Sequence, residues 1–98
     1  MIELGEIWSD IRNDELVRKT KFDPNFLSLI AEIVKKNGYH EAKLYLWDFH
    51  ASREDLREQA LALVSVLNRI EKDKFIRKDR SVGSYILKEL MILKSTEI

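Results

Sequence analysis

Hydrophobic positions recur at intervals of three and four along most of the chain, which is the spacing of one face of an α-helix. The clearest run lies between Ser52 and Lys78, and its central turn, ALALVSVL, is apolar nearly all round. The pattern predicts one long central helix over this range, about 38 Å long at 1.5 Å per residue. The residues of its main stripe are Leu56, Ala60, Leu63, Leu67 and Ile70.

The charged residues at the two ends of this predicted helix complement the helix dipole. Ser52 can cap the N-terminus, and Glu54 and Asp55 put carboxylates in the first turn, where negative charge is favoured. A second apolar stripe, Leu61 and Val64, lies beside the first, so the middle of the helix belongs in a core. The far end is basic, with Lys72, Lys74, Arg77 and Lys78 placed to meet the negative end of the dipole.

A second helix has clear signals at both of its ends. Asp23 can cap it, and Pro24 suits the first helical position because proline lacks an N–H that would have no partner there. Asn37 and Gly38 supply the left-handed residue that commonly ends a helix. We therefore expect a helix between Pro24 and Asn37.

The two ends of the chain also show helical spacing. Residues 2–12 are expected to form an amphipathic helix, after which Asn13 and Asp14 break or re-cap the chain. Near the other end, Ser84 is the expected cap of a last helix.

Residues 40–50 suit two secondary structures. Ala42, Leu46 and Phe49 share one helical face, whereas aromatic residues at every second position from Tyr45 onward would also suit a strand. We favour a helix, because no second strand is predicted that could pair with this one.

Together these segments predict an all-α fold, a helical bundle of about five helices around one long central helix. A chain of 98 residues with 45% hydrophobic residues, three glycines and one proline suits a single helical domain over residues 1–98. No internal repeat or Gly/Ser/Pro-rich linker suggests a second domain.

Charge and cysteine content narrow the possible partners. The chain has 17 basic and 17 acidic residues, so no overall field attracts nucleic acid or a membrane surface. It has no cysteine, which excludes disulfides and thiolate metal sites. The acidic N-terminus and the lack of a long apolar run lead us to expect a soluble, cytoplasmic protein without membrane contact.

The residues that often carry chemistry are poorly spaced for it. His40 and His50 lie ten positions apart, whereas helical metal ligands recur at three or four. Glu54, Asp55 and Glu58 suit the opening turn of a helix better than acid–base work. With no Gly-rich phosphate loop either, we expect no catalytic residues, no metal, no cofactor and no enzyme activity.

Aromatic residues are the first candidates for a binding surface. Tyr and Trp are favoured interface anchors, because they bury a large area at a small entropic cost. Most of them are expected in the core, and Trp47 is our choice for the exposed anchor, since it points away from the stripe that contains Leu46. The candidate protein-interface residues are Trp8, Tyr39, Tyr45 and Trp47.

A basic segment, residues 72–80, is the second candidate. It could meet phosphates, although Asp73 and Asp79 dilute it, and the plainer interpretation is a solvated helix end that complements the dipole. The candidate nucleic-acid-binding residues, including one just upstream, are Arg69, Lys72, Lys74, Arg77, Lys78 and Arg80.

The order of features in residues 2–35 adds a family resemblance. A first helix of mixed apolar and charged residues is followed by a leucine and then by Asp23 and Phe26 at the opening of an apolar helix. This order resembles the helical domain of GINS subunits, which commonly show a Leu-rich link followed by an Asp-Phe-Tyr element. Here two residues separate Asp23 from Phe26, and Leu27 replaces the tyrosine.

The later part of the chain is similar to the same domain. GINS helical domains end a long central helix in a basic stretch before an isoleucine, and NRIEKDKFI, with Arg69, Lys72, Lys74 and Ile76, looks similar. The small β-rich domain that usually accompanies the helical one has no candidate strands here. The resemblance implies a non-enzymatic scaffold that ties the replicative helicase to other replication proteins.

Two functional hypotheses follow. The leading one is a non-enzymatic protein–protein interaction module that binds protein partners or forms a homo-oligomer; in its narrower form, it is a GINS-like subunit of a DNA replication complex. The alternative is a small helical nucleic-acid-binding protein that uses the basic end of the central helix.

Overall fold

The computed structural model describes residues 4–73 and 76–95, and within them the chain is helical and contains no strand. The all-α prediction is therefore confirmed, and so is the helix over residues 40–50. The described helices are α1 (Leu4–Arg12), α2 (Glu15–Lys19), α3 (Pro24–Asn37), α4 (Tyr39–Ser52), α5 (Arg57–Glu71) and α6 (Arg80–Ser95), with two 3₁₀ turns, η1 (Glu54–Leu56) and η2 (Ile76–Lys78).

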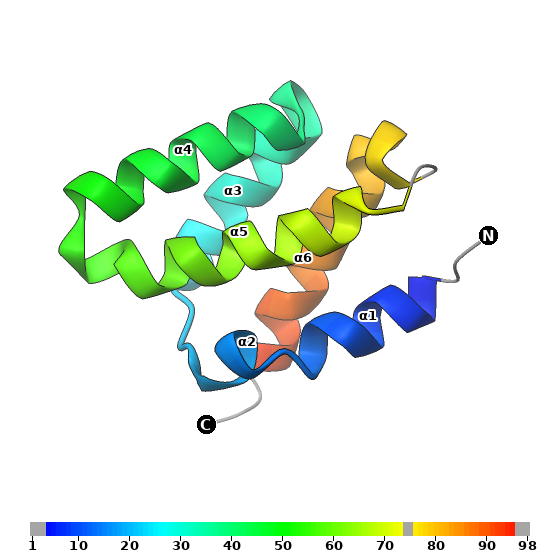
Figure 1. The fold of residues 1–98 in the computed structure, drawn as a ribbon, viewed down its shortest axis with the longest axis horizontal. Coiled ribbons are helices and arrows are strands. Elements are labelled where there is room, and N and C mark those ends of the chain that lie inside the picture. Colours follow the sequence, from blue (N-terminus) through cyan, green and yellow to red (C-terminus); the bar gives the residue numbers. More distant parts are fainter. Residues whose placement is uncertain (1–3, 74–75, 96–98) are drawn as a thin grey trace.

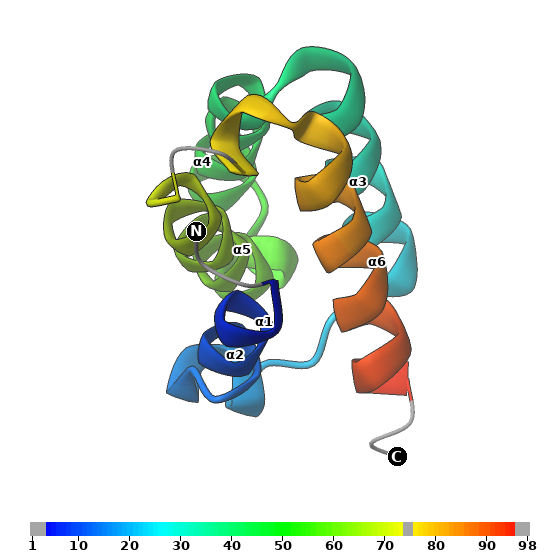
Figure 2. The same ribbon diagram turned by 90° about the vertical axis from the view of Figure 1, so that its right-hand side faces the viewer.

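The helices form two layers (Figures 1 and 2). Helices α4 and α5 lie side by side in one layer, with α1 and α2 beside the other edge of α5. Behind them, α3 packs most extensively against α6. Figure 2 shows α5 reaching the outer edge of the first layer, so its outward face is not covered by another described helix.

One hydrophobic core lies between the layers. Its members come from α1 to α6, as their spacing predicts, and the radius of gyration of 12.3 Å is close to the roughly 12.6 Å expected for a folded chain of this length. The largest fully buried side chains include Ile11, Leu27, Ile30, Leu46, Leu63, Leu67, Ile70, Ile86, Leu87 and Leu90.

The predicted long helix from Ser52 to Lys78 is wrong at its start. Ser52 is the last residue of α4, and its hydroxyl donates to the carbonyl of Asp48 at 2.8 Å instead of capping a new helix. Arg53 then leaves the helical conformation, with φ −124° and ψ 96°, and η1 turns the chain back. Because the chain reverses here, α4 and α5 pack against each other, and α5 spans only about 22 Å.

The same prediction is wrong at the far end. The last turn of α5 tightens as the N–H groups of Lys72 and Asp73 bond three residues back, to Arg69 and Ile70, both at 3.3 Å. The carboxylate of Asp73 then accepts the N–H of Ile76 at 3.0 Å, which starts η2. Helical periodicity continues through this turn in the sequence, but α5 ends at Glu71 with a tightened last turn. The predicted helical residues Lys74 and Phe75 lie outside the described residues.

The expected signals around α3 are confirmed. Asp23 caps its N-terminus by accepting the N–H of Asn25 at 2.8 Å, and Pro24 is the first helical residue. Gly38 ends the helix with φ +98°, a conformation that side chains rarely tolerate, and its N–H donates to Ile33 and Val34. This single residue separates α3 from α4.

The expected cap of the last helix is wrong. Asp79 accepts the N–H of Ser81 at 3.0 Å, so α6 begins at Arg80 and Ser84 lies buried within it. The equivalent signal earlier in the chain is confirmed, because Asp14 caps α2 through the N–H groups of Leu16 and Val17.

Candidate protein-interaction face

The four aromatic residues predicted to form an interface separate into two groups. Trp47 and Tyr45 on α4 are 47% and 49% exposed, and Trp47 is exposed as expected. Trp8 is partly buried and packs against the core. Tyr39 is 6% exposed, so it belongs to the core and offers no accessible surface to a partner.

Tyr39 joins the two layers at one end of the bundle. Its hydroxyl donates to the carbonyl of Asp79 at 3.0 Å, and its ring lies against Gly83 of α6. Burial raises the pKa of Tyr39 to about 12. This buried, neutral phenol explains why an aromatic residue that looked like a surface anchor is structural.

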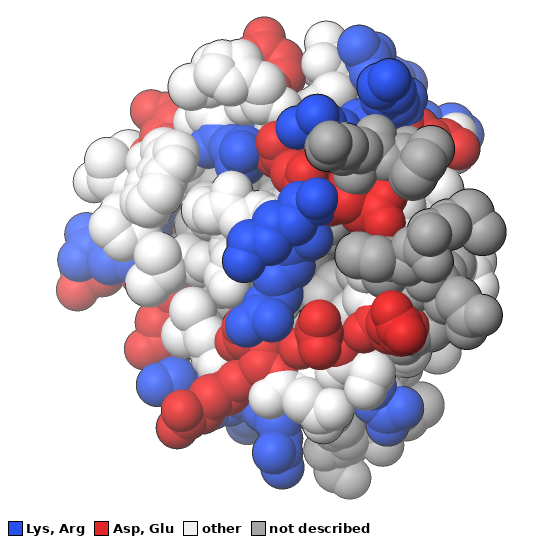
Figure 3. Space-filling model, turned by 45° about the vertical axis from the view of Figure 1, so that its right-hand side comes forward, with Lys and Arg blue, Asp and Glu red and all other residues white. Residues whose placement is uncertain are grey.

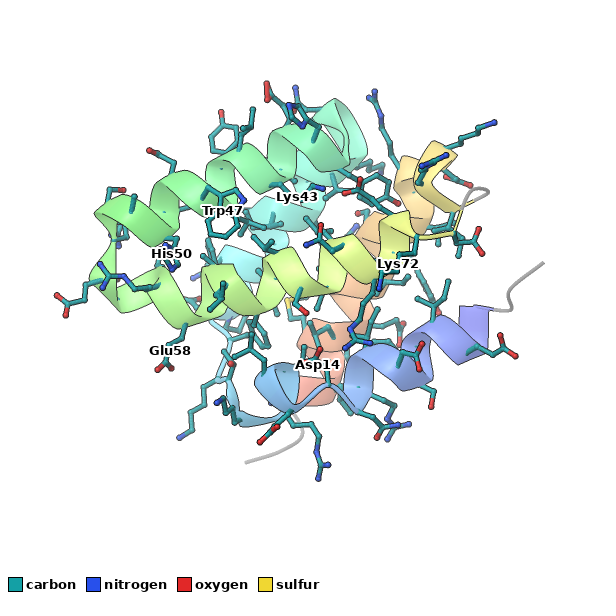
Figure 4. The ribbon with its side chains drawn as sticks, viewed as in Figure 1. Asp14, Lys43, Trp47, His50, Glu58 and Lys72 are labelled. Atoms are coloured by element: carbon teal, nitrogen blue, oxygen red, sulfur yellow. The ribbon has the colours of Figure 1, made fainter. Side chains whose placement is uncertain are left out.

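Trp47 lies beside a hollow on the outer face of α4 and α5. The indole meets the ring of His50 edge to face at 5.5 Å, and Figure 4 shows both side chains on α4. The hollow has a volume of about 520 Å³. It is lined by Leu16, Trp47, Leu61, Val64, Ser65, Asn68, Arg69 and Lys72.

Two ion pairs connect α5 to the helices on either side of it, α4 and α2. Lys43 of α4 contacts Glu71 at 2.8 Å, and Arg69 contacts Asp14, the cap of α2, at 2.8 Å. Arg69 uses two nitrogens for the same carboxylate oxygen, and Ser65 donates to that oxygen at 3.3 Å. These contacts link α4 and α2 to α5 on the two sides of the hollow.

The charge of Asp14 depends on these contacts. Burial alone would raise the pKa of its carboxyl, but the N–H groups of Val17 and Leu16 and the Arg69 guanidinium favour the ionised form. Together they hold the pKa of Asp14 below its usual value. The carboxylate therefore stays charged where α2 meets α5.

A line of five residues runs along the outward side of α5, and we call it the α5 stripe. From the N-terminal end, its residues are an acid, an exposed leucine, a serine, an amide and a base. They are spaced three and four positions apart, so they share one side of the helix. Figure 4 shows Glu58 and Lys72 at opposite ends of α5. The α5 stripe consists of Glu58, Leu61, Ser65, Asn68 and Lys72.

Exposed apolar side chains border this stripe. Leu61 is 39% exposed, although its spacing predicted a second buried stripe, and Leu44 on α4 is 51% exposed. Leu44 lies three positions before Trp47 and so shares its face of α4. Their contribution was missed in the sequence, where the available signal was that the apolar residues of α4 are not confined to the stripe that contains Leu46.

The predicted nucleic-acid-binding residues do not form one group. Arg69 is paired with Asp14, and Arg80 donates to the Lys36 carbonyl of α3 at 3.1 Å. Figure 3 shows basic and acidic side chains interleaved on the face it displays. Lys72 is the residue that follows α5, Arg77 and Lys78 lie exposed in η2, and Lys74 lies outside the described residues.

Two further hollows lie elsewhere on the surface. One, of about 580 Å³, mixes both signs of charge between the α2–α3 connection and the start of α5, and the other, of about 170 Å³, lies between α3 and α6. The first is lined by Lys19, Lys21, Glu54, Asp55, Arg57, Glu58 and Gln59. The second is lined by Lys35, Ser81, Ser84, Tyr85 and Lys88.

Neither His40 nor His50 belongs to a group of described side chains that could bind a metal ion. Across residues 4–73 and 76–95, no group of three His, Asp or Glu side chains is arranged to hold a metal ion. Nor does any helix in the described part of the chain have both the length and the apolar character needed to cross a membrane.

The chain was also compared with known proteins. No protein-family model, no curated protein and no solved structure matches it. The face formed by α4 and α5 is therefore interpreted from its own residues.

Proposed function

We propose that this chain is a non-enzymatic protein–protein interaction module that assembles through the outer face of α4 and α5, with Trp47 as its anchor. The observation that carries the proposal is the exposure of Trp47, at 47%, beside Leu61 and Leu44 on a face bounded by two ion pairs. Exposed tryptophan next to apolar side chains is the composition typical of an interface hot spot.

Fluorescence of the free chain tests the first part of this proposal. In a Trp8→Phe variant, Trp47 is the only indole, so its emission should be quenched readily by iodide in the free chain and protected in a complex. If iodide fails to reach Trp47 in the free chain, the anchor is not available and the proposal fails.

Substitution of the anchor tests the second part. Trp47→Ala should leave the melting temperature nearly unchanged and weaken assembly, because the side chain is half exposed and contributes little to folding. Tyr85→Ala is the matched control, since Tyr85 is a 53% exposed aromatic residue on α6, in the other layer. Equal loss of assembly in both variants would contradict the role of the α4 and α5 face.

Within this class, we propose the narrower assignment to a GINS-like subunit of a DNA replication complex. It is supported by the resemblance of residues 2–35 and of the NRIEKDKFI segment to GINS helical domains. The test is affinity purification of the tagged chain from its own cells, followed by mass spectrometry. Recovery of replication proteins that is lost with Trp47→Ala would support the assignment, and partners from another process would overturn it.

Nucleic-acid binding is the weaker alternative. Arg69 and Arg80 are engaged within the fold, so fewer cations are available for phosphates than the sequence suggested. A DNA or RNA affinity that falls with salt at a log–log slope of about −0.9 per phosphate contact would favour it. Lys78→Glu should then weaken binding, whereas Lys35→Glu on α3 should not.

A further inference from the structure

The two charged residues of the α5 stripe lie at equal distances on either side of its central residue, Ser65, and they have opposite charges. Glu58 lies seven positions before Ser65 and Lys72 lies seven positions after it, so each is about 10.5 Å from Ser65 along the helix axis. Both side chains are exposed, and neither has a salt bridge within the described residues. A helix face of this kind is complementary to itself when two copies run antiparallel.

We propose that the α5 stripe binds a second copy of this chain, forming a two-fold symmetric dimer in which the two α5 helices pack antiparallel and cross at Ser65. This inference rests on the proposed interaction function of the α4 and α5 face. In a two-fold interface the same patch is used twice, so Glu58 of each copy meets Lys72 of the other. Ser65 at the crossing point has a small, partly buried side chain that lines the hollow and donates to Asp14, so the partner helix would lie over this hollow.

The surface around the stripe suits this arrangement. Helix α5 reaches the outer edge of its layer in Figure 2, so a second helix can approach it. A stable dimer buries about 800 Å² on each copy, which is roughly an eighth of the 6255 Å² surface of the chain. The stripe alone is too narrow for that area, and the exposed side chains of Trp47 and Leu44 on α4 extend it.

At the basic end of the stripe, two neighbouring cations are already paired within the fold. Arg69 and Lys43, which border the basic end of the stripe, are paired with Asp14 and Glu71. Lys72, at that end of the stripe, is exposed and has no salt bridge to another described residue. Parallel packing of the two helices would place like charges together, so the charge pattern selects the antiparallel arrangement.

Reversing the charges of Glu58 and Lys72, singly and together, in the full chain tests the proposal. Sedimentation velocity between about 1 and 500 µM should show a monomer–dimer equilibrium for the natural chain. Glu58→Lys and Lys72→Glu should each raise the dimer dissociation constant about tenfold, because each creates two like-charge contacts. The double variant Glu58→Lys with Lys72→Glu restores both pairs and should return to within about threefold of the natural value.

The controls separate this result from general effects of charge. Lys35→Glu on α3 makes the same change of charge in the other layer and should leave dimerisation unchanged. Circular dichroism should show equal helix content in all variants, since both substituted side chains of the stripe are exposed. In the Trp8→Phe background, iodide quenching of Trp47 should fall as protein concentration rises.

The outcomes distinguish this inference from the function on which it rests. A chain that stays monomeric to about 500 µM, or a double variant that does not recover, overturns the dimer. If Trp47→Ala still abolishes binding to another protein in that case, the face serves a different partner and the proposed function stands. If the chain is monomeric and Trp47→Ala also leaves binding to other proteins unchanged, the dimer and the proposed interaction function are both wrong.

Discussion

Gly83 lies inside a helix because the ring of Tyr39 occupies the space beside it. A Cβ atom added at Gly83 would lie 2.5 Å from two atoms of Tyr39, its Cε1 and its hydroxyl oxygen. Alanine is normally better than glycine in a helix by about 1 kcal/mol, but here the overpacked ring should reverse the sign. We expect Gly83→Ala to lower the free energy of unfolding by about 1–3 kcal/mol in urea denaturation.

The same substitution in a Tyr39→Leu background provides the control. Without the ring, Gly83→Ala should become neutral or stabilising, since only the helix preference remains. A stabilising effect in the natural background would show that Tyr39 does not pack as described.

Asp14 gives the second prediction at the scale of single residues. Asparagine can still cap α2, so Asp14→Asn removes mainly the charge that pairs with Arg69. We expect a loss of about 1–2 kcal/mol at neutral pH, moderated because the Arg69 side chain is 40% exposed.

The pH dependence of that loss follows from the lowered pKa of Asp14. The carboxyl binds its proton less tightly in the folded chain, so its contribution is complete above the unfolded pKa and disappears as pH falls through the folded one. The stability difference between the natural chain and Asp14→Asn, measured by urea denaturation, should therefore be constant above about pH 5 and shrink below about pH 4. A difference that stays constant down to pH 2 would contradict the ion pair.

At the scale of elements, the capping residues decide where α6 begins. Asp79→Ala removes the side chain that accepts the N–H of Ser81, and it should cost about 0.5–2 kcal/mol. Ser84→Ala should cost little or stabilise, because its buried hydroxyl has no hydrogen-bond partner in the described structure. Thermal unfolding of both variants decides between the two caps, and a larger loss for Ser84→Ala would place the start of α6 at Ser84.

Burial along α5 gives a further prediction. Leu63 and Leu67 are fully buried, so replacing either with alanine should lower the free energy of unfolding by about 2–5 kcal/mol. Leu61, on the same helix but 39% exposed, is the control and should lose less than about 1 kcal/mol. Similar losses at all three positions in urea denaturation would mean that α5 has a different orientation.

The elements also show how far the sequence could predict the structure. Asp23, Pro24 and Gly38 were identified because their chemistry acts on neighbouring residues and needs no distant partner. Ser52 and Ser84 could cap equally well on sequence grounds, but the chain reverses at Arg53, and Asp79 caps α6 in place of Ser84. Periodicity reports which side of a segment is apolar, and it does not report where the segment bends.

For the candidate site, the exposure of Trp47 was predictable from its position opposite an apolar stripe. The ion pair of Asp14 with Arg69 was not, because it joins residues 55 positions apart that only the packing of α2 on α5 brings together. The burial of Tyr39 likewise depends on η2 and α6.

At the scale of the whole molecule, the pairing of α3 with α6 has a consequence for synthesis. These helices share the most extensive contact in the structure, yet α4 and α5 lie between them in the chain. While the chain emerges from the ribosome, α4 and α5 can pair early, but the apolar side of α3 stays uncovered until α6 has left the exit tunnel. A nascent chain stalled before α6 should therefore present α3 to chaperones, and release of the last helix should end that contact.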